Sequence, residues 1–278
     1  GQNTNVPLIV EHEIITLPSA STLAILRQNY GDRKPPSQTL AILADPVFSP
    51  TDERVKGQLT PATTEQLESN NLGLNRSLRA SNREWPPKRL PFTRQEAQTI
   101  SSLFPSASSR QIFDFDASRT TATNGNLVNY QIIHLATHGI ANNKNPELSG
   151  IVMSMVDDKG NLVNGFLRLT DIFNLKLGAN LVVLSACQSG MGQNVKGEGM
   201  VGLTRGFMYA GAQRVAVSLW SVDDEGTAVL MQKFYQKMLQ QKLAPAAALR
   251  AAQIEMMQQE KWISPYYGAA FTLQGEWK

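Results

Sequence analysis

Short runs of aliphatic and β-branched residues alternate with amphipathic stretches along most of this chain. This alternation is typical of a mostly parallel sheet with helices on both faces, because each strand is followed by a helix that crosses back over the sheet. Several runs are apolar almost throughout, as strands buried on both faces must be. We expect strands in the runs that begin at Thr39, Gln111, Gln131, Asn180, Arg214 and Tyr267.

Apolar residues recur at helical spacing between these strands and predict helices over 93–103, 198–210, 223–241 and 245–259. A glycine-containing turn in VDDKGNLV separates two apolar runs and predicts a β-hairpin inserted between residues 151 and 166. The stretch PLIVEHEIITLP near the start is typical of a strand pair at the edge of the sheet. The expected fold class is therefore α/β, with a mostly parallel sheet, helices on both faces and an inserted hairpin.

Composition excludes several classes of protein. With 278 residues, of which 42% are hydrophobic and 18% charged, the chain is expected to be globular. Its net charge of +3 is spread along the sequence, which gives no basic stripe for nucleic acid. No apolar run is long enough to cross a bilayer, and one cysteine cannot form an internal disulfide. We expect a cytoplasmic protein with no membrane partner, and the first residue, Gly1, suggests a piece of a longer chain.

Residues 47–90 differ from the rest because they are polar, contain prolines and arginines, and lack apolar periodicity. We interpret this segment as a long, partly mobile loop. A tolerated surface insertion is the favoured interpretation. The alternative is a segment that is cleaved, even by the protein itself, at one of its basic residues: Arg54, Arg76, Arg79, Arg83 or Arg89.

Histidine is scarce, and each of the three histidines can be considered separately. His134 and His138 would lie about 13 Å apart on an extended chain, at roughly 3.3 Å per residue, so a shared metal ion is not expected. His134 lies within an apolar strand, which favours a structural role in the interior. His138 follows that strand, with Gly139 after it. Open parallel sheets build their sites at this place, so His138 is suited to act as a base.

The single cysteine, Cys187, follows the strand LVVLSA and precedes a glycine-rich stretch. It is either a small buried apolar residue or a nucleophile. Free backbone amides in such a stretch favour a thiolate and can hold an oxyanion. If the strands that begin at Gln131 and Asn180 are neighbours, His138 and Cys187 emerge at one edge of the sheet as a dyad. No histidine follows Cys187, which excludes the chain orders of α/β-hydrolases and papain-like enzymes.

Several longer motifs are distinctive: HLATHG, PELSGIVMS, GFLRLTDIFNLKL, LSACQSGMG, GEGMVGLTRGFMYAGAQRVAVSLWSVDDEGT and SPYYGAAFTLQGEW, together with LPFTRQEAQTISSLFP before residue 131. In these motifs the chain resembles the CHAT domain family, which is similar to caspases and separases and often accompanies tetratricopeptide repeats, notably in cyanobacteria. The resemblance covers all 278 residues as a single domain and is densest over 131–278, the expected catalytic core. It implies a regulated cysteine endopeptidase with His138 as base, Cys187 as nucleophile and the amides of Gly139 and Cys187 as oxyanion hole.

The resemblance also indicates a pocket for a basic side chain of a protein or peptide substrate. SLWSVDDEG resembles a separase motif whose acidic residue lines that pocket, which makes Asp224 the first candidate and Asp223 the second. Each of them could instead cap a helix. Asp45 could reach the pocket from the first strand. Ser185 stands where metacaspases carry an aspartate, which weakens the expected basic selectivity.

Two functions remain open at this point. The first is the endopeptidase, regulated by a tetratricopeptide-repeat or other domain. The second is a catalytically silent scaffold that keeps the caspase-like shape for partner recognition. We expect no cofactor and no metal, since the sequence shows no acidic cluster suited to calcium.

Overall fold

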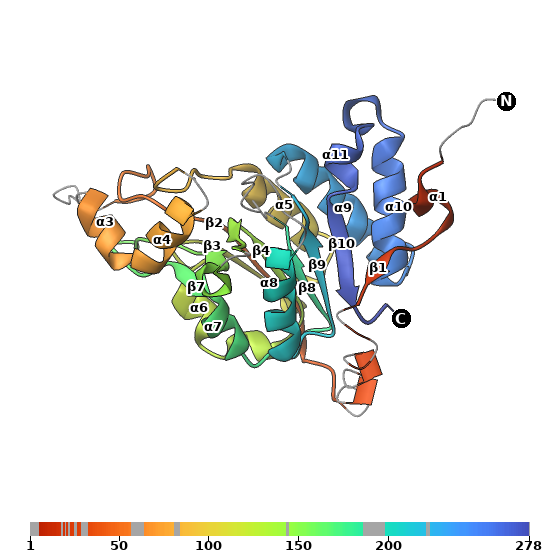
Figure 1. Ribbon diagram of the computed structural model, residues 1–278, viewed down its shortest axis with the longest axis horizontal. Coiled ribbons are helices and arrows are strands. Elements are labelled where there is room, and N and C mark those ends of the chain that lie inside the picture. Colours follow the sequence, from red (N-terminus) through yellow and green to blue (C-terminus); the bar gives the residue numbers. More distant parts are fainter. Residues whose placement is uncertain are drawn as a thin grey trace.

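A seven-stranded sheet forms the centre of the protein in a computed structural model (Figure 1). The structure describes residues 6–17, 19, 21, 23–24, 27–28, 33–56, 64–80, 84–142, 145–185, 198–220 and 223–277. The strand order in the sheet is β1-β10-β9-β8-β4-β2-β3. These strands are β1 (Ile15–Thr16), β2 (Gln38–Pro46), β3 (Ser109–Asp114), β4 (Tyr130–Ala136), β8 (Leu181–Leu184), β9 (Arg214–Ser218) and β10 (Phe271–Gly275).

The five strands β3, β2, β4, β8 and β9 are parallel to one another, whereas β10 runs antiparallel to β9. The expected mostly parallel sheet is therefore confirmed. The helices are α1 (Leu8–Glu11), α3 (Thr64–Asn70), α4 (Leu72–Ala80), α5 (Phe92–Ser101), α6 (Arg119–Thr123), α7 (Leu169–Phe173), α8 (Glu198–Tyr209), α9 (Asp224–Gln240), α10 (Pro245–Met257) and α11 (Pro265–Gly268).

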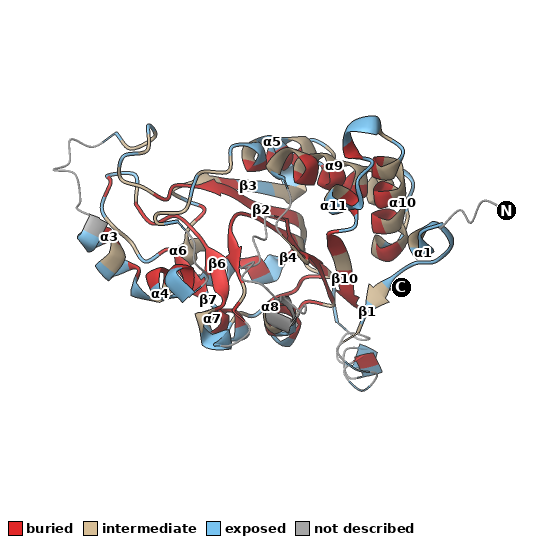
Figure 2. Cartoon of the chain, turned by 45° about the horizontal axis from the view of Figure 1, so that its top comes forward, coloured by how far each residue is buried: buried red, intermediate tan, exposed pale blue. Residues whose placement is uncertain are grey.

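Alternate residues of each central strand enter two separate cores, because side chains of a strand point to opposite faces. On one face, Leu43 and Val182 pack into a cluster that includes Phe207 of α8 and residues of α6 and α7. On the other face, Ile42 and Val183 pack into a cluster with α5, α9 and α10. Figure 2 shows the central strands buried between these helices. Helices on both faces of the sheet confirm the expected α/β class.

The expected hairpin is confirmed and is part of a second, smaller sheet. Strands β6 (Gly150–Val152) and β7 (Phe166–Arg168) pair antiparallel, and β5 (Gly139–Ile140) pairs with β6. Between β6 and β7, a bridge joins Val156 to Leu162. Because β5 begins directly after His138, the small sheet holds the chain that leaves β4.

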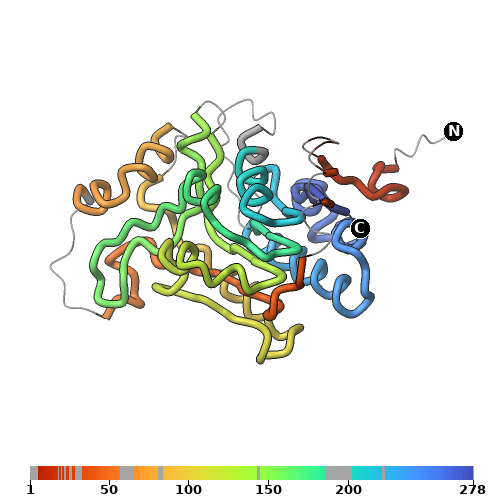
Figure 3. Tube along the Cα trace, turned by 90° about the horizontal axis from the view of Figure 1, so that it is seen from below, coloured from red at the N-terminus to blue at the C-terminus, as the bar shows by residue number. Residues whose placement is uncertain are grey.

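Residues 47–90 are not a long loop, which corrects the sequence-based expectation. They contain α3 and α4, and Leu67, Leu74 and Leu78 of these helices pack with Phe166 of the small sheet. The three buried leucines are spaced at i, i+7 and i+11, which is a helical period, but they stand among polar residues. Their partners lie far along the chain, so the packing surface could not be recognised locally. The pair α3–α4 lies at the end of the molecule opposite to α1 and α10 (Figure 3).

Two further boundaries differ from the sequence-based prediction. The strand expected from Tyr267 begins at Phe271, because Tyr267 and Gly268 belong to α11. Pro265 occupies the first turn of this helix, and the Ser264 side chain accepts a hydrogen bond from the Tyr266 amide. Near the start, residues 8–11 form α1 instead of a strand, and only β1 joins the sheet, beside β10. Arg250 of α10 donates a hydrogen bond to the Ile9 carbonyl, at 2.7 Å, and so connects the first helix to the C-terminal third.

The packing of β6 against β7 gives a stability prediction. A methyl group at Gly150 would meet the Leu167 carbonyl oxygen at 2.5 Å and the Phe166 ring at 2.6 Å. We expect Gly150→Ala to lower the free energy of unfolding by about 1–3 kcal/mol. The matched control is Gly202→Ala on α8, where the nearest atom lies 3.9 Å away. There alanine should raise stability by up to about 1 kcal/mol because it favours helix. Urea unfolding of both variants measures this, and equal effects would contradict it.

Candidate functional site

Two neighbouring parallel strands deliver the candidate residues to the same edge of the sheet. Leu135 of β4 is in register with Leu184 of β8, and the Ser185 amide donates a hydrogen bond to the Leu135 carbonyl at 3.1 Å. The pairing of these two strands, on which the expected dyad depends, is therefore confirmed. Parallel sheets gather their sites at the carboxyl ends of strands. His138 and Ser185 lie at this edge, while Cys187 lies outside the described residues.

His138 is almost fully buried, with 5% of its surface exposed. Its ring lies 5.3 Å from the ring of Phe48, centroid to centroid. The Nε2 atom lies 2.6 Å from the carbonyl oxygen of Lys88. Because a carbonyl only accepts hydrogen bonds, Nε2 carries a proton in this contact. The neutral ring then has its lone pair on Nδ1, so the Lys88 carbonyl sets the tautomer of His138.

Lys88 belongs to the site, although no sequence pattern indicates it. Its contribution is a backbone carbonyl, which every residue possesses, so composition and periodicity cannot identify it. Its side chain is mostly exposed and pairs with Glu84 at 2.8 Å. Backbone of the small sheet also lies beside His138, where the Val152 amide donates to the His138 carbonyl at 2.8 Å and Gly139 pairs with Ile151. The oxyanion role of Gly139 stays a prediction.

His134 has the structural role that the sequence predicts. The side chain is fully buried, with its Nε2 atom 2.8 Å from Glu96 Oε1 and its Nδ1 atom 3.0 Å from the hydroxyl of Tyr235. Burial raises the pKa of the Tyr235 hydroxyl well above its usual value, and the charge of Glu96 raises it further. The three side chains connect β4 to α5 and α9 through the interior.

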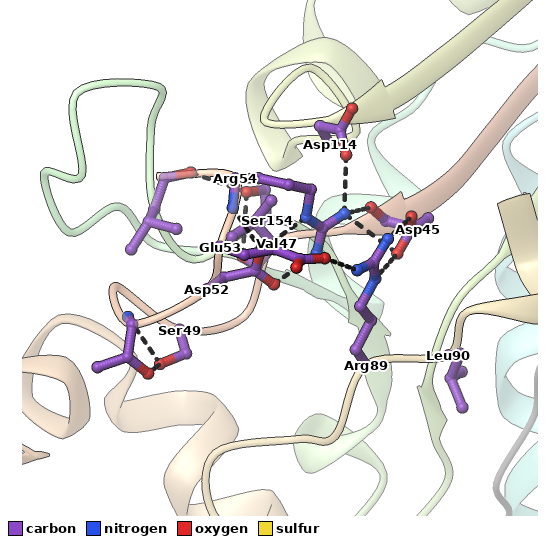
Figure 4. Close-up of polar contacts among 12 residues, drawn as sticks. Asp45, Val47, Ser49, Asp52, Glu53, Arg54, Arg89, Leu90, Asp114 and Ser154 are labelled. Atoms are coloured by element: carbon purple, nitrogen blue, oxygen red, sulfur yellow. Dashed lines mark hydrogen bonds and ion pairs between the residues drawn. The ribbon is translucent and has the colours of Figure 1, made fainter. Parts of the chain in front are cut away.

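Asp45 lies at the end of β2 and is surrounded by arginines of the chain itself. It has a left-handed backbone conformation, with φ of 50°, and its side chain is fully buried. Arg89 binds the carboxylate with two hydrogen bonds of 2.9 Å, Arg94 binds Oδ2 at 2.8 Å, and Arg54 lies 3.1 Å from Oδ1. Figure 4 shows Arg54 and Arg89 converging on Asp45. A basic side chain of a substrate would have to displace one of these arginines.

The arginines around Asp45 also bind a second layer of carboxylates. Arg54 contacts Asp52 and Asp114, each at 2.7 Å, and Arg94 also pairs with Asp114. The hydrogen bond from Arg54 lowers the pKa of the Asp52 carboxyl. Hydrogen bonds between ionised partners are stronger than neutral ones, and an arginine can bind a carboxylate with two of them. The cluster therefore ties the segment that holds Arg54 and Arg89 to the ends of β2 and β3.

The two adjacent acids before α9 have different roles. Asp223 caps α9, because its Oδ2 atom accepts a hydrogen bond from the Gly226 amide at 2.9 Å. Asp224 is the first residue of the helix, and its Oδ2 atom accepts a hydrogen bond from the Phe92 amide at 3.1 Å. Burial raises the pKa of Asp224 to about 6. The nearby carboxylates of Glu96, Asp223 and Asp45 also raise it, and the Phe92 amide lowers it.

Ser185, the remaining pocket candidate, directly follows β8. Its side chain is 1% exposed, and its hydroxyl oxygen has no hydrogen-bond partner among the described residues. Within the same residues, no group of three histidine, cysteine or acidic side chains is arranged to hold a metal ion. None of the helices described combines the length and the apolar character that a membrane crossing requires.

Comparison with known sequences identifies one family. The family model named "CHAT domain" matches residues 1–276. Tetratricopeptide repeat protein 28 of Mus musculus is 37% identical over 109 residues, which is 39% of this chain and 4% of that protein. The Homo sapiens protein of the same name is 35% identical over 109 residues, with the same coverage. The match thus spans a small fraction of these relatives' length.

Comparison with solved structures supports the fold. A Saccharomyces cerevisiae separase–securin complex aligns with 95% of this chain and 14% of the other, at a TM-score of 0.52 and 16% identity. The Arg-specific cysteine proteinase gingipain R aligns with 87% of this chain and 46% of the other, at a TM-score of 0.47 and 9% identity. At such low identity the separase likeness concerns the fold alone, and it confirms the expected caspase-like architecture.

The raised pKa of Asp224 predicts a pH dependence of stability. A carboxyl whose pKa is higher in the folded state stabilises the fold when protonated, and this contribution is lost as the pH rises through about 6. Asn at this position keeps an acceptor for the Phe92 amide but cannot ionise. Between about pH 4 and about pH 7, the wild type should therefore lose free energy of unfolding relative to Asp224→Asn.

Urea unfolding of both proteins across that pH range measures the difference. The matched control is Asp223→Asn, which retains a side-chain oxygen to cap α9. It keeps the Asp224 carboxyl and should lose stability with pH as the wild type does, with the transition moved slightly to lower pH because one carboxylate that raises the pKa of Asp224 is removed. A difference between wild type and Asp224→Asn that stays constant with pH would show that Asp224 is not desolvated in the folded protein.

Proposed function

This chain belongs to the CHAT domain family, and from this premise we propose that it is a regulated cysteine endopeptidase with His138 as general base and Cys187 as nucleophile. The observation that carries the proposal is the 2.6 Å contact between His138 Nε2 and the Lys88 carbonyl. It leaves Nδ1 as the nitrogen that can accept a proton. Since β4 and β8 are neighbours, a residue that soon follows β8 is well placed to supply that proton.

The reaction follows from these roles. Nδ1 of His138 takes the thiol proton of Cys187, and the thiolate attacks the carbonyl carbon of the substrate peptide bond. Amides of Gly139 and Cys187 hold the oxyanion that forms. When the C–N bond breaks, His138 returns its proton to the amine that leaves, and a thioester remains on Cys187. His138 then deprotonates a water molecule that hydrolyses the thioester, which restores the thiol.

For specificity, we propose that Asp224 binds an arginine or lysine side chain before the cut. Its carboxylate is half-buried and its raised pKa marks a desolvated charge, which a substrate cation would compensate. Ser185, with its buried hydroxyl, is a second candidate for this pocket. Asp223 and Asp45 are weaker candidates, because Asp223 caps α9 and Asp45 binds three arginines.

Regulation by other domains is also part of the proposal. The curated relatives are tetratricopeptide repeat proteins, and this chain matches a small part of each. A repeat domain in the full-length protein would control access to the site or present the protein substrate to it.

The dyad is tested by the reactivity of the single cysteine. A peptidyl electrophile that carries arginine should label Cys187 in the native chain, as followed by intact mass. His138→Ala keeps the sulfur but removes the base, so the rate of labelling should fall by about 100-fold or more. After unfolding, iodoacetamide should label both proteins equally. A native rate that is unchanged in His138→Ala would contradict the dyad, and no native labelling of either protein would favour the scaffold function.

Peptide specificity tests the pocket separately. Among fluorogenic peptides with Arg, Lys, Leu or Asp before the cut, we expect cleavage after Arg and Lys. Asp224→Asn should lower kcat/KM for the basic peptides by about 10- to 100-fold, since it removes the charge of a charge-assisted hydrogen bond. Cys187→Ala serves as the inactive control. Cleavage of basic peptides that is unchanged in Asp224→Asn would assign the pocket to other residues.

A further inference from the structure

The stretch 84–91 lies against His138. Its Trp85 packs against the cluster around the small sheet, and Arg89, next to the contact with His138, binds the end of β2 in the central sheet. The Lys88 carbonyl accepts a hydrogen bond from His138. The following residue, Arg89, donates two hydrogen bonds to the Asp45 carboxylate, from Nε to Oδ1 and from Nη2 to Oδ2. The Lys88 side chain is 78% exposed and pairs only weakly in solvent with Glu84. The position of the Lys88 carbonyl therefore depends on what holds its neighbour.

Asp45 is a rigid attachment point. It ends β2, which is paired on both sides with β3 and β4, and its side chain is fully buried. Arg54 and Arg94 bind the same carboxylate from two other parts of the chain. The carboxylate is therefore held in place independently of Arg89, and it fixes the guanidinium of Arg89 in a planar, two-bonded geometry.

From this arrangement we infer that Asp45 and Arg89 are positioning residues, whose ion pair holds the Lys88 carbonyl on Nε2 of His138. The inference deepens the proposed function, since the tautomer so fixed is the one in which Nδ1 can act as a base. It gives Asp45 a different role from the substrate pocket expected from the sequence. The hydrogen bond between His138 Nε2 and the Lys88 carbonyl is present in the fold itself, so its dependence on Arg89 can be measured without peptidase activity.

A second explanation of the same contacts is that Arg89 inhibits the enzyme. In this case Arg89 would bind the Asp45 carboxylate in the place that a basic side chain of the substrate would otherwise take. The structure favours positioning. If Arg89 were withdrawn, Arg54 and Arg94 would still bind the Asp45 carboxylate, at 3.1 and 2.8 Å. Withdrawal would therefore not free the carboxylate for a substrate. The two explanations predict opposite changes in activity when Arg89 is removed.

Proton NMR of the 278-residue chain tests the positioning directly. A ring N–H that is hydrogen-bonded and buried exchanges slowly with water, so His138 should give a protected low-field signal, which His138→Ala assigns. In Arg89→Ala we expect this signal to be lost or broadened by fast exchange. Arg89→Lys, which keeps one contact with Asp45, should retain it in part. The ring signals of His134, buried between Glu96 and Tyr235, should persist in every variant and show that the core is intact.

Kinetics separate the two explanations. For a positioning residue, Arg89→Ala should lower kcat by about 10- to 100-fold, with KM for the peptide changed less than about twofold. The matched control is Arg79→Ala, an exposed arginine that pairs with Glu68 at 3.2 Å and lies away from His138. It should leave both the signal and the rate unchanged.

Two results would overturn the inference. One is an Arg89→Ala variant in which the His138 signal is as protected as in the wild type. The other is a rise in kcat/KM in that variant, which would identify Arg89 as a block. Failure of the proposed function is distinguishable from these. It would appear as a chain that neither reacts with the electrophile nor cleaves peptides, or as cleavage that survives Cys187→Ala, while the His138 signal still responds to Arg89→Ala.

Discussion

Parallel pairing of β4 with β8 is the constraint on which the candidate site depends. It places Leu135 beside Leu184, so that the chain leaves both strands at one edge of the sheet. The pairing is enforced by burial, because alternate residues of these strands must enter two different cores. A shift of register by one residue would turn each apolar set to the wrong face. The positions of His138 and of the segment after Ser185 thus follow from how the core packs.

The surroundings of His138 are built from parts that are distant in sequence. The small sheet that starts at Gly139 holds one side of the chain after β4, and α3 and α4 pack against that sheet. On the other side, the Lys88 carbonyl contacts the ring, while the Asp45 cluster connects Arg89 to the end of β2. Buried ion pairs are costly to break, since a lone buried charge is left behind. The cluster is therefore suited to hold backbone near a reactive side chain.

The sequence predicts the central sheet better than the site around it. The strands that begin near Thr39, Gln131 and Asn180 are apolar and β-branched, and a strand needs only that local pattern. In contrast, Leu67, Leu74 and Leu78 pack against Phe166 and its neighbours, which lie far along the chain. The partners of Asp45 lie 9, 44 and 49 residues away, at Arg54, Arg89 and Arg94. The contact of Lys88 is made by backbone. None of these long-range or backbone interactions has a local signature.

In the proposed enzyme, the His138 imidazole holds its proton on Nε2 and faces the sulfur of Cys187 with Nδ1. The most direct measurement is a crystal structure of the chain with Cys187 bonded to an arginine-bearing peptidyl electrophile. We predict the sulfur within about 3–4 Å of His138 Nδ1, with Nε2 still on the Lys88 carbonyl. A sulfur at another edge of the sheet, or an imidazole that presents Nε2 to it, would contradict the account.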